Sequence, residues 1–329
     1  MDLDAYAAVH EDNWRRLDKL AGQRRRTGAE SDELVRLYQA AATDLSVIRS
    51  AAPDPEMVTR LSQLVGRARA AIAGTHEASW RDVWAFVAVT LPAAFYRTRW
   101  WTVGVMAAFV TVAVIAGVWV GAHPDVLASM GTDSELRQYV EHDFVDYYGP
   151  GAGFAAQVWT NNAWIAAVCV GTGITGLLPV LMLYQNAVSV GNAGGLMYAY
   201  GELDTFFQLI APHGLLELTA VFVAGGAGLQ LFWTWIAPGP RTRGRALAQE
   251  GRALFTVAIG LVGVLLVSGL VEGFVTGSSL PWWAKVIVGA IALAGYWTYT
   301  LVLGGRAARA GATGDLADDR AGYALATAG

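Results

Sequence analysis

The chain has 329 residues, of which 54% are hydrophobic and only 15% are charged, whereas an ordinary soluble domain has about 25% charged residues. Its net charge of −4 gives no general attraction to nucleic acid, so a nucleic-acid partner is not expected. Long uncharged stretches after Trp100 indicate that one part of the chain lies in lipid, and the more charged first hundred residues indicate a soluble part.

Residues 1–96 are predicted to form a soluble domain of amphipathic helices. Ser31 and Pro55 are typical helix starts, and Gly74 is a plausible stop. Leu34, Leu37 and other apolar residues recur at helical spacing, and a small antiparallel bundle would bury that stripe. The last helix has an apolar face that suits either the membrane interface or packing against the bundle. The expected helices cover residues 6–20, 31–50, 55–73 and 79–95.

Uncharged runs after this domain predict a transmembrane domain over residues 97–305. The first run is long enough to cross a hydrocarbon core of about 30 Å. Five runs are clear, although the one over 213–236 contains Glu217. A further apolar segment, over 187–210, contains several glycines and the acidic residues Glu202 and Asp204. The clear crossings are expected at about 100–121, 159–184, 213–236, 253–271 and 283–303.

The distribution of arginines decides how many times the chain crosses. Arginines precede the first crossing, the loop over 122–158 is acidic, and Arg241, Arg243 and Arg245 precede residue 253. Both basic regions should be cytoplasmic. Five crossings would leave the second one outside, so we predict that 187–210 forms a sixth, broken crossing. This places both termini in the cytoplasm of a multi-pass protein of the bacterial inner membrane, with residues 306–329 as a disordered tail.

Two motifs suggest chemistry, but the surrounding sequence argues against it. The glycines of residues 171–176, GTGITG, have the spacing of a dinucleotide-binding turn, but this turn lies within an uncharged run with no strand before it, so no cofactor is expected. One histidine with one or two carboxylates falls short of a zinc ligand set, so no metal is expected. Cys169 is interpreted as a small core residue. We therefore expect no catalytic residues and a protein that is not an enzyme. An intramembrane enzyme is the least favoured of three hypotheses for its function.

Glycines four residues apart predict where helices approach closely in lipid. Such pairs occur at Gly117 and Gly121, at Gly191 and Gly195, and at Gly269 and Gly273, followed by Gly277. Packing within one protomer is the favoured interpretation. A seam between two copies is the alternative, and on this basis we predict a homodimer.

The strongest polar feature is the segment over residues 211–218. Pro212 is predicted to open a helix, so that His213 and Glu217 share one face in its first turns. Ionisable residues in a membrane segment usually face the interior and have a function. The alternative is a structural pair in which His213 donates a hydrogen bond to Glu217. The full candidate set comprises Asn161, Asn162, Asn186, Gly191, Asn192, Pro212, His213, Gly214, Glu217 and Glu272, which together could line one polar site.

These residues resemble the stage II sporulation protein M family of bacterial membrane proteins. The resemblance rests on the Pro-His-Gly-x-x-Glu block at 212–217, the asparagine pair at 161–162, Asn186 with Gly191, and Glu272 in the segment over 271–276. It extends over nearly the full length, because Trp14, Leu17, Tyr38, Asp44, Leu45, Leu61 and Leu64 look like the family's N-terminal helices. Ser62 is a departure, because the family commonly has asparagine there.

The resemblance implies a scaffold and not a hydrolase, because the family is known for organising septal peptidoglycan hydrolases during sporulation. The composition looks actinobacterial, and such relatives occur in bacteria that form no endospores. We therefore expect a non-enzymatic scaffold or accessory protein of the cell envelope. Its partners would be membrane lipids and envelope proteins such as cell-wall hydrolases. The rival hypothesis is a permease-like subunit that moves a lipid or small solute and is driven by a separate ATPase.

Overall fold

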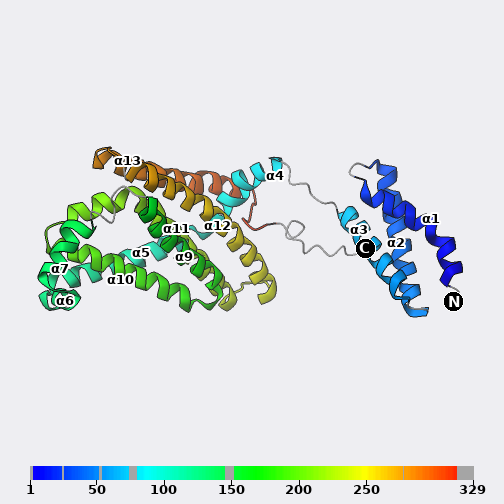
Figure 1. The fold of residues 1–329 in the computed structure, drawn as a ribbon, viewed down its shortest axis with the longest axis horizontal. Helices are drawn as coiled ribbons and strands as arrows, with labels where there is room; N and C mark the ends of the chain where they lie inside the picture. The colour runs from blue at the N-terminus through cyan, green and yellow to red at the C-terminus, as the bar shows by residue number, and fades with distance from the viewer. Residues whose placement is uncertain are drawn as a thin grey trace. The chain divides into compact units, whose positions relative to one another are not determined.

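The computed structural model describes residues 3–23, 26–51, 54–73, 80–144, 152–276 and 278–316, and these ranges contain helices and connecting turns but no strand. The predicted all-α class is therefore confirmed (Figure 1). The chain divides into two compact units, one within Met1–Trp80 and the other within Arg81–Ala324. The predicted boundary at residue 96 lies inside the second unit, because the helix expected over 79–95 continues into the first long apolar helix.

The first unit is a bundle of three helices whose limits agree closely with those predicted. They are α1 (Leu3–Gly22), α2 (Gly28–Ala51) and α3 (Pro55–Ala73). The predicted start of α2 at Ser31 is wrong, because Thr27 caps the helix. The Thr27 hydroxyl accepts a hydrogen bond from the backbone N–H of Glu30, and the Glu30 carboxylate accepts one from the backbone N–H of Thr27.

The core of this bundle is apolar except for one carboxylate. Leu17, Leu20 and Ile48 are completely buried. Among them, Asp44 of α2 accepts hydrogen bonds from the Tyr6 hydroxyl at 2.8 Å and from the Trp14 indole nitrogen at 2.9 Å. Because a buried carboxylate is stabilised only when it is hydrogen-bonded, Asp44 fixes the register of α1 on α2.

The second unit consists of long helices joined by short connections. Several helices contain π-helical turns, which insert one extra residue and change the direction of the side chains that follow. In chain order the elements are α4 (Trp80–Ala85), η1 (Phe86–Thr90), α5 (Leu91–Ala122), α6 (Pro124–Met130), α7 (Asp133–Gln138), η2 (Tyr139–Asp143), α9 (Ala152–Gly171), η3 (Gly173–Thr175), α10 (Leu177–Ala199), α11 (Leu203–Ile236), α12 (Arg243–Val271), η4 (Glu272–Thr276), α13 (Trp282–Thr298), η5 (Tyr299–Gly304) and α14 (Gly305–Arg309).

Four continuous helices in the described part of the chain are long and apolar enough to cross a membrane: Trp80–Ala122, Leu203–Ile236, Arg243–Thr276 and Trp282–Arg309. This protein is therefore a membrane protein. The helices α9 and α10 carry amide side chains at Asn161, Asn162, Asn186 and Asn192.

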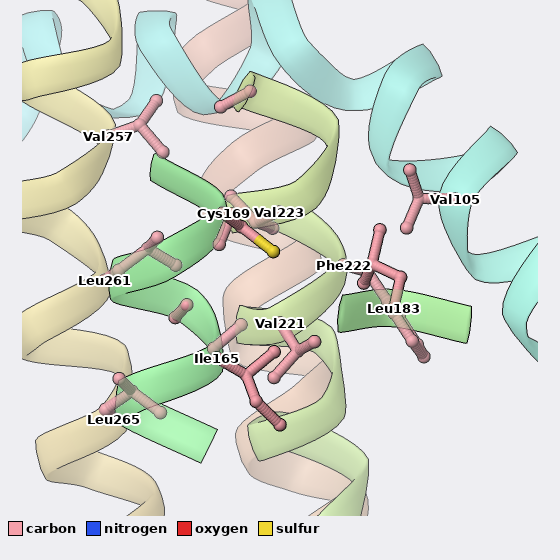
Figure 2. Close-up of a cluster of buried hydrophobic side chains, with 14 of the residues drawn as sticks. Val105, Ile165, Cys169, Leu183, Val221, Phe222, Val223, Val257, Leu261 and Leu265 are labelled. Atoms are coloured by element: carbon pink, nitrogen blue, oxygen red, sulfur yellow. The ribbon is translucent and has the colours of Figure 1, made fainter. Parts of the chain in front are cut away.

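Contacts between the long helices show that their directions alternate. Gly117 of α5 packs against Gly191 of α10, and Gly121 packs against Tyr198, so these two helices are parallel. The helices α11 and α12 are antiparallel, because Gln230 bonds to Glu250 near one end and His213 to Ser268 near the other. Cys169 of α9 lies among the buried apolar side chains of this unit (Figure 2). A Cβ added to Gly228 of α11 would be 2.4 Å from the Cys169 carbonyl oxygen.

The predicted limits of the second and third crossings are wrong. The helix expected over 159–184 ends at Gly171, and residues 172–176 form a turn in which Gly176 has a φ of 66° that favours glycine. The segment expected as a broken crossing over 187–210 contains the end of the unbroken helix α10. Gly201, with a φ of 84°, lies in the turn between α10 and α11, whereas Gly191, Gly194 and Gly195 lie within α10 and do not break it. They allow close packing, because a Cβ on Gly191 would lie 2.3 Å from the Ala113 carbonyl oxygen on α5.

The predicted disorder of residues 306–329 is also wrong for the part that the structure describes. Residues 305–309 form α14, and Gly314 packs against the backbone of Ala94 on α5. Gly314 has a φ of 77°, and a Cβ there would lie 2.5 Å from the Ala94 nitrogen. Glycine is therefore required for this contact. Residues 317–329, and Gly74 and Gly277 of the sequence predictions, lie outside the described residues.

Candidate functional site

The candidate site is centred on α11, the helix with the most buried surface in the second unit. Glu217 is 1% exposed and His213 is 2% exposed, although both side chains are ionisable. The sequence predicted that Pro212 opens this helix, but Pro212 lies inside it. His213 and Glu217 therefore lie well inside α11 and not in its first turns, so the partial positive charge of the helix N-terminus is distant from both side chains.

The carboxyl group of Glu217 makes no hydrogen bond within the described residues. Both of its oxygen atoms are buried without a hydrogen-bond partner, so the bond from His213 that the structural alternative required is not formed. The side-chain amide of Asn162, on α9, faces this carboxyl group closely enough to interact with it, but not with the geometry of a hydrogen bond. Asn162 is itself buried. The amide dipole is therefore the polar environment that α9 provides for Glu217.

A second carboxyl group enters the same region from η4, the turn that continues α12. Glu272 is 5% exposed, and neither of its oxygen atoms has a hydrogen-bond partner in the described part of the chain. It lies close enough to Glu217 for the two groups to repel one another electrostatically when both are charged. Glu272 opens the π-helical turn η4, and such turns often occur at functional sites because they redirect a side chain.

Backbone contacts around Pro212 hold α11, α12 and α13 together. The hydroxyl of Ser268 on α12 donates a hydrogen bond to the carbonyl of His213 at 3.2 Å. On the other side, Gly289 of α13 is so close that a Cβ there would lie 2.2 Å from the Pro212 carbonyl oxygen. Proline in a helix interrupts the normal hydrogen-bond pattern. Here the neighbouring helices pack against the interrupted turn and determine its position.

This arrangement suits the transfer or binding of a proton or a small cation. Two carboxyl groups that share an apolar interior are stabilised by a positive charge between them, and an imidazole nearby can accept or donate a proton. In the described part of the chain, no group of three His, Cys, Asp or Glu residues is arranged to hold a metal ion.

The structure brings together only some of the residues singled out in the sequence. Asn162, Glu217 and Glu272 meet, His213 is buried one helical turn before Glu217 on α11, and Asn161 is exposed. Asn186 lies on α10, where its amide nitrogen is buried without a hydrogen-bond partner among the described residues, and Asn192 is half-buried on the same helix. Gly191 contacts α5 instead of the polar site. Gly214 faces a different side of α11, next to Ile210.

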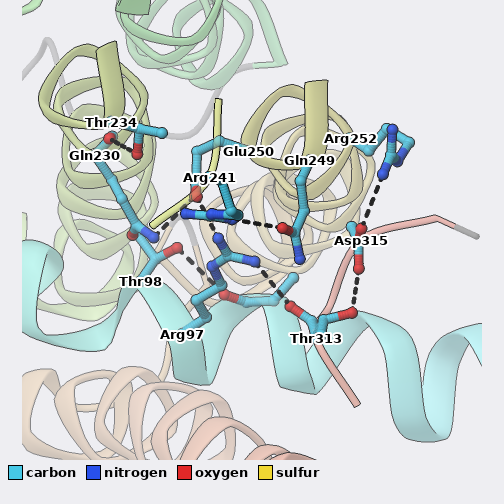
Figure 3. A network of polar contacts seen from close by, with 11 residues as sticks. Arg97, Thr98, Gln230, Thr234, Arg241, Gln249, Glu250, Arg252, Thr313 and Asp315 are labelled. Atoms are coloured by element: carbon cyan, nitrogen blue, oxygen red, sulfur yellow. Dashed lines mark hydrogen bonds and ion pairs between the residues drawn. The ribbon is translucent and has the colours of Figure 1, made fainter. Parts of the chain in front are cut away.

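Sequence reasoning missed a second polar network, which links α5, α11 and α12 (Figure 3). Arg97 forms an ion pair with Glu250, and Gln230 donates a hydrogen bond to the other carboxylate oxygen at 2.8 Å. Arg97 also donates to the carbonyl of Thr313, and Arg252 pairs with Asp315 at 3.3 Å. The signal was present, because Glu250 and Arg252 stand directly before an apolar run, but only the folded structure identifies their partners.

Comparison with known families divides the chain in the same way as its folding units. A family model described as Stage II sporulation protein M matches residues 106–277, which include the whole candidate site. A separate model, described as Domain of unknown function (DUF8413), matches residues 4–74. The comparison therefore does not confirm that the N-terminal helices belong to the first family. Searches of curated proteins and of solved structures gave no match.

Proposed function

Because the chain belongs to the stage II sporulation protein M family, we propose that it is a non-enzymatic scaffold or accessory protein of the bacterial cell envelope. In this proposal the membrane unit anchors the protein in the cytoplasmic membrane. The N-terminal bundle recruits envelope proteins, such as cell-wall hydrolases or their regulators. The proposal includes neither a catalytic residue nor a bound cofactor.

The observation that carries this proposal is the self-contained character of the N-terminal bundle. It has its own apolar core, which includes the hydrogen-bonded carboxylate of Asp44. Ion pairs also join its helices, including Arg16 with Glu33 at 2.7 Å and Arg60 with Glu11 at 2.6 Å. Val35 and Gln39 of α2 are exposed on the outside of the bundle. A folded unit with free outer faces, attached to a membrane anchor, suits recruitment better than transport.

We further propose six crossings, with both termini in the cytoplasm. The alternating directions of α5, α9, α10, α11, α12 and α13 support this topology. Arg241, Arg243 and Arg245 are exposed near the end of α11, whereas Asp133 and Glu135 belong to α7, which packs near its start. The hydrogen bonds that Arg137 and Tyr200 donate to Asp133 lower the pKa of its carboxyl group and keep it negative. The basic end should be cytoplasmic.

A crosslinking pull-down from native membranes tests the scaffold proposal. The full chain would be compared with a Val35→Asp/Gln39→Arg variant, which alters the outer face of α2, and with Glu217→Gln, which alters the polar site. We expect envelope proteins to be captured, with capture reduced by the first variant and unchanged by the second. Capture of an ATPase that depends on Glu217 would contradict the scaffold.

The second candidate function is a permease-like subunit driven by a separate ATPase. The observation that favours it is the buried pair of Glu217 and Glu272, because ionisable groups within membrane helices usually mark a path for ions or substrates. Uptake or release by reconstituted vesicles that depends on Glu217 would support it. Vesicles without transport, containing a chain that purifies without an ATPase, would count against it.

The proposed homodimer needs a surface other than the glycine faces of α5 and α10. The structure shows Gly117, Gly191 and Gly195 in contact with one another inside one protomer, as the favoured interpretation expected. The outward side of α12 is an alternative surface, where Phe255, Val262 and other apolar residues are exposed at helical spacing. Mass measurement in mild detergent and in nanodiscs decides between a dimer and a monomer.

A further inference from the structure

A long apolar groove runs along the opposite side of α11 from the polar site. Its volume is about 900 Å³, which lies in the range of about 300–1,000 Å³ typical of ligand pockets. The walls come from α5, α11 and α13, and glycines of α10, including Gly194 and Gly195, form the floor. The glycines have no side chains to fill this space, so the helix packing described above also creates the groove.

The groove has the length and chemistry of a site for hydrocarbon. Along α11 it extends from Leu203 to Phe222, which is about 28 Å at about 1.5 Å per residue. Its lining side chains are apolar or small except for Tyr198 and Thr219, and the Thr219 hydroxyl already donates to the Leu215 carbonyl at 2.7 Å. The lining therefore offers little recognition for a charged or strongly polar solute.

The groove opens toward the surroundings of the membrane unit. Val118 is 64% exposed on α5 and Phe207 is 58% exposed on α11, at its two edges. Both helices are long and apolar enough to cross a membrane, so the medium at this opening is the hydrocarbon core, about 30 Å thick. An acyl chain of one leaflet reaches about half that depth, so the groove is long enough to hold a whole chain.

We propose that this groove is a binding site for the acyl chain of a phospholipid. The chain lies lengthwise between α5 and α11 and over the glycines of α10, and it replaces contacts that an empty groove would leave unmade. This inference depends on the membrane location of the second unit. It does not depend on the scaffold role, on a partner protein or on Glu217, because Gly214 and Leu218 line the groove from another face of the helix.

Photocrosslinking in nanodiscs tests the proposal on the full chain. The nanodiscs would contain phosphatidylglycerol with a diazirine in the middle of one acyl chain, and the crosslinked residues would be mapped by mass spectrometry. We expect crosslinks to concentrate on Val114, Phe207 and Leu218, with about tenfold more label there than on the exposed face of α12, the ratio that corresponds to about 1.4 kcal/mol.

A matched pair of variants tests whether the groove itself binds the chain. Ala211→Phe places a ring in the groove, whereas Ala108→Phe places one on an exposed face of α5 outside it. The first should lower labelling of Val114 and Leu218 by about tenfold and the second should leave it unchanged. If Ala211→Phe does not fold, the labelling map of the unchanged chain still decides the question.

Two results would overturn the proposal. Equal labelling of the groove and of Val262 and Leu266 on α12 would mean that lipid contacts all apolar faces alike. Absence of label in the groove, together with disulfide-linked dimers of a Val118→Cys variant, would mean that a second copy of the chain covers it.

Discussion

Arg97 of α5 and Glu250 of α12 form an ion pair in which the Glu250 side chain is 6% exposed and the Arg97 side chain is 24% exposed. The pair joins two helices that are far apart in the sequence (Figure 3). Arg97→Ala would leave the Glu250 carboxylate buried with Gln230 as its remaining donor, and we expect the free energy of unfolding to fall by about 1–3 kcal/mol.

A double-variant cycle in detergent checks this value. Combining Arg97→Ala with Glu250→Leu removes both charges, so the loss should be smaller than for Arg97→Ala alone. Equal losses for the single and the double variant would show that the pairing itself does not matter.

Gly289 and Gly295 on α13 provide a comparison within one helix. A Cβ at Gly289 would collide with the Pro212 carbonyl, whereas a Cβ at Gly295 would meet no atom within 4 Å. We expect Gly289→Ala to lower stability by about 1–3 kcal/mol, because α13 must move away from α11. Gly295→Ala should change stability little, and this is measured by thermal unfolding in the same detergent. Similar melting temperatures for the two variants would refute the close contact.

Asp44 is expected to hold the N-terminal bundle together. Asp44→Ala leaves the Tyr6 hydroxyl and the Trp14 indole without their acceptor, at a cost of about 1–3 kcal/mol. Hydrogen exchange of peptides from α1 should then be faster, with peptides from α11 unchanged. Asp12→Ala is the control, because that side chain is 91% exposed. Protection of α1 that survives in Asp44→Ala would show that apolar packing alone sets the register.

Two substitutions of Glu217 separate the effect of its charge from the effect of its shape. Glu217→Ala removes a buried side chain and leaves a cavity, so we expect the free energy of unfolding to fall by about 1–3 kcal/mol. Glu217→Gln keeps the shape and removes the charge that faces Glu272, so it should be at least as stable as the unchanged chain. If Gln abolishes function while folding is intact, the charge is essential, and the scaffold proposal must yield to a permease or a proton-coupled process.

Cysteine labelling tests the six-crossing topology. Ser134 precedes the end of α7 and Arg243 begins α12, and both are exposed. In spheroplasts, a membrane-impermeant maleimide should label Ser134→Cys directly and Arg243→Cys only after lysis. Cys169 is buried and should contribute little background. Labelling of Arg243→Cys from outside would overturn the proposed orientation.

The sequence alone determined that this is an α-helical membrane protein with a charged N-terminal bundle, because composition and periodicity depend on which solvent surrounds each segment. It also indicated that Glu217, His213, Asn162 and Glu272 are important, because ionisable and amide groups are conspicuous in apolar runs. It misjudged the helix limits around residues 171–212, where glycines resemble breaks. In the structure, those of α10 are contact points with α5.

Only the tertiary structure decided which of these polar groups meet and which surfaces remain open. The ion pair of Arg97 with Glu250, and the proximity of Glu217 to Glu272, depend on how separate helices pack, and a single sequence contains no direct record of that packing. The groove is a property of the same packing. Glycines that bring α10 close to α5 also leave the space beside α11 unfilled. Their spacing predicted close helix packing, but neither the partner helix nor the open groove follows from it.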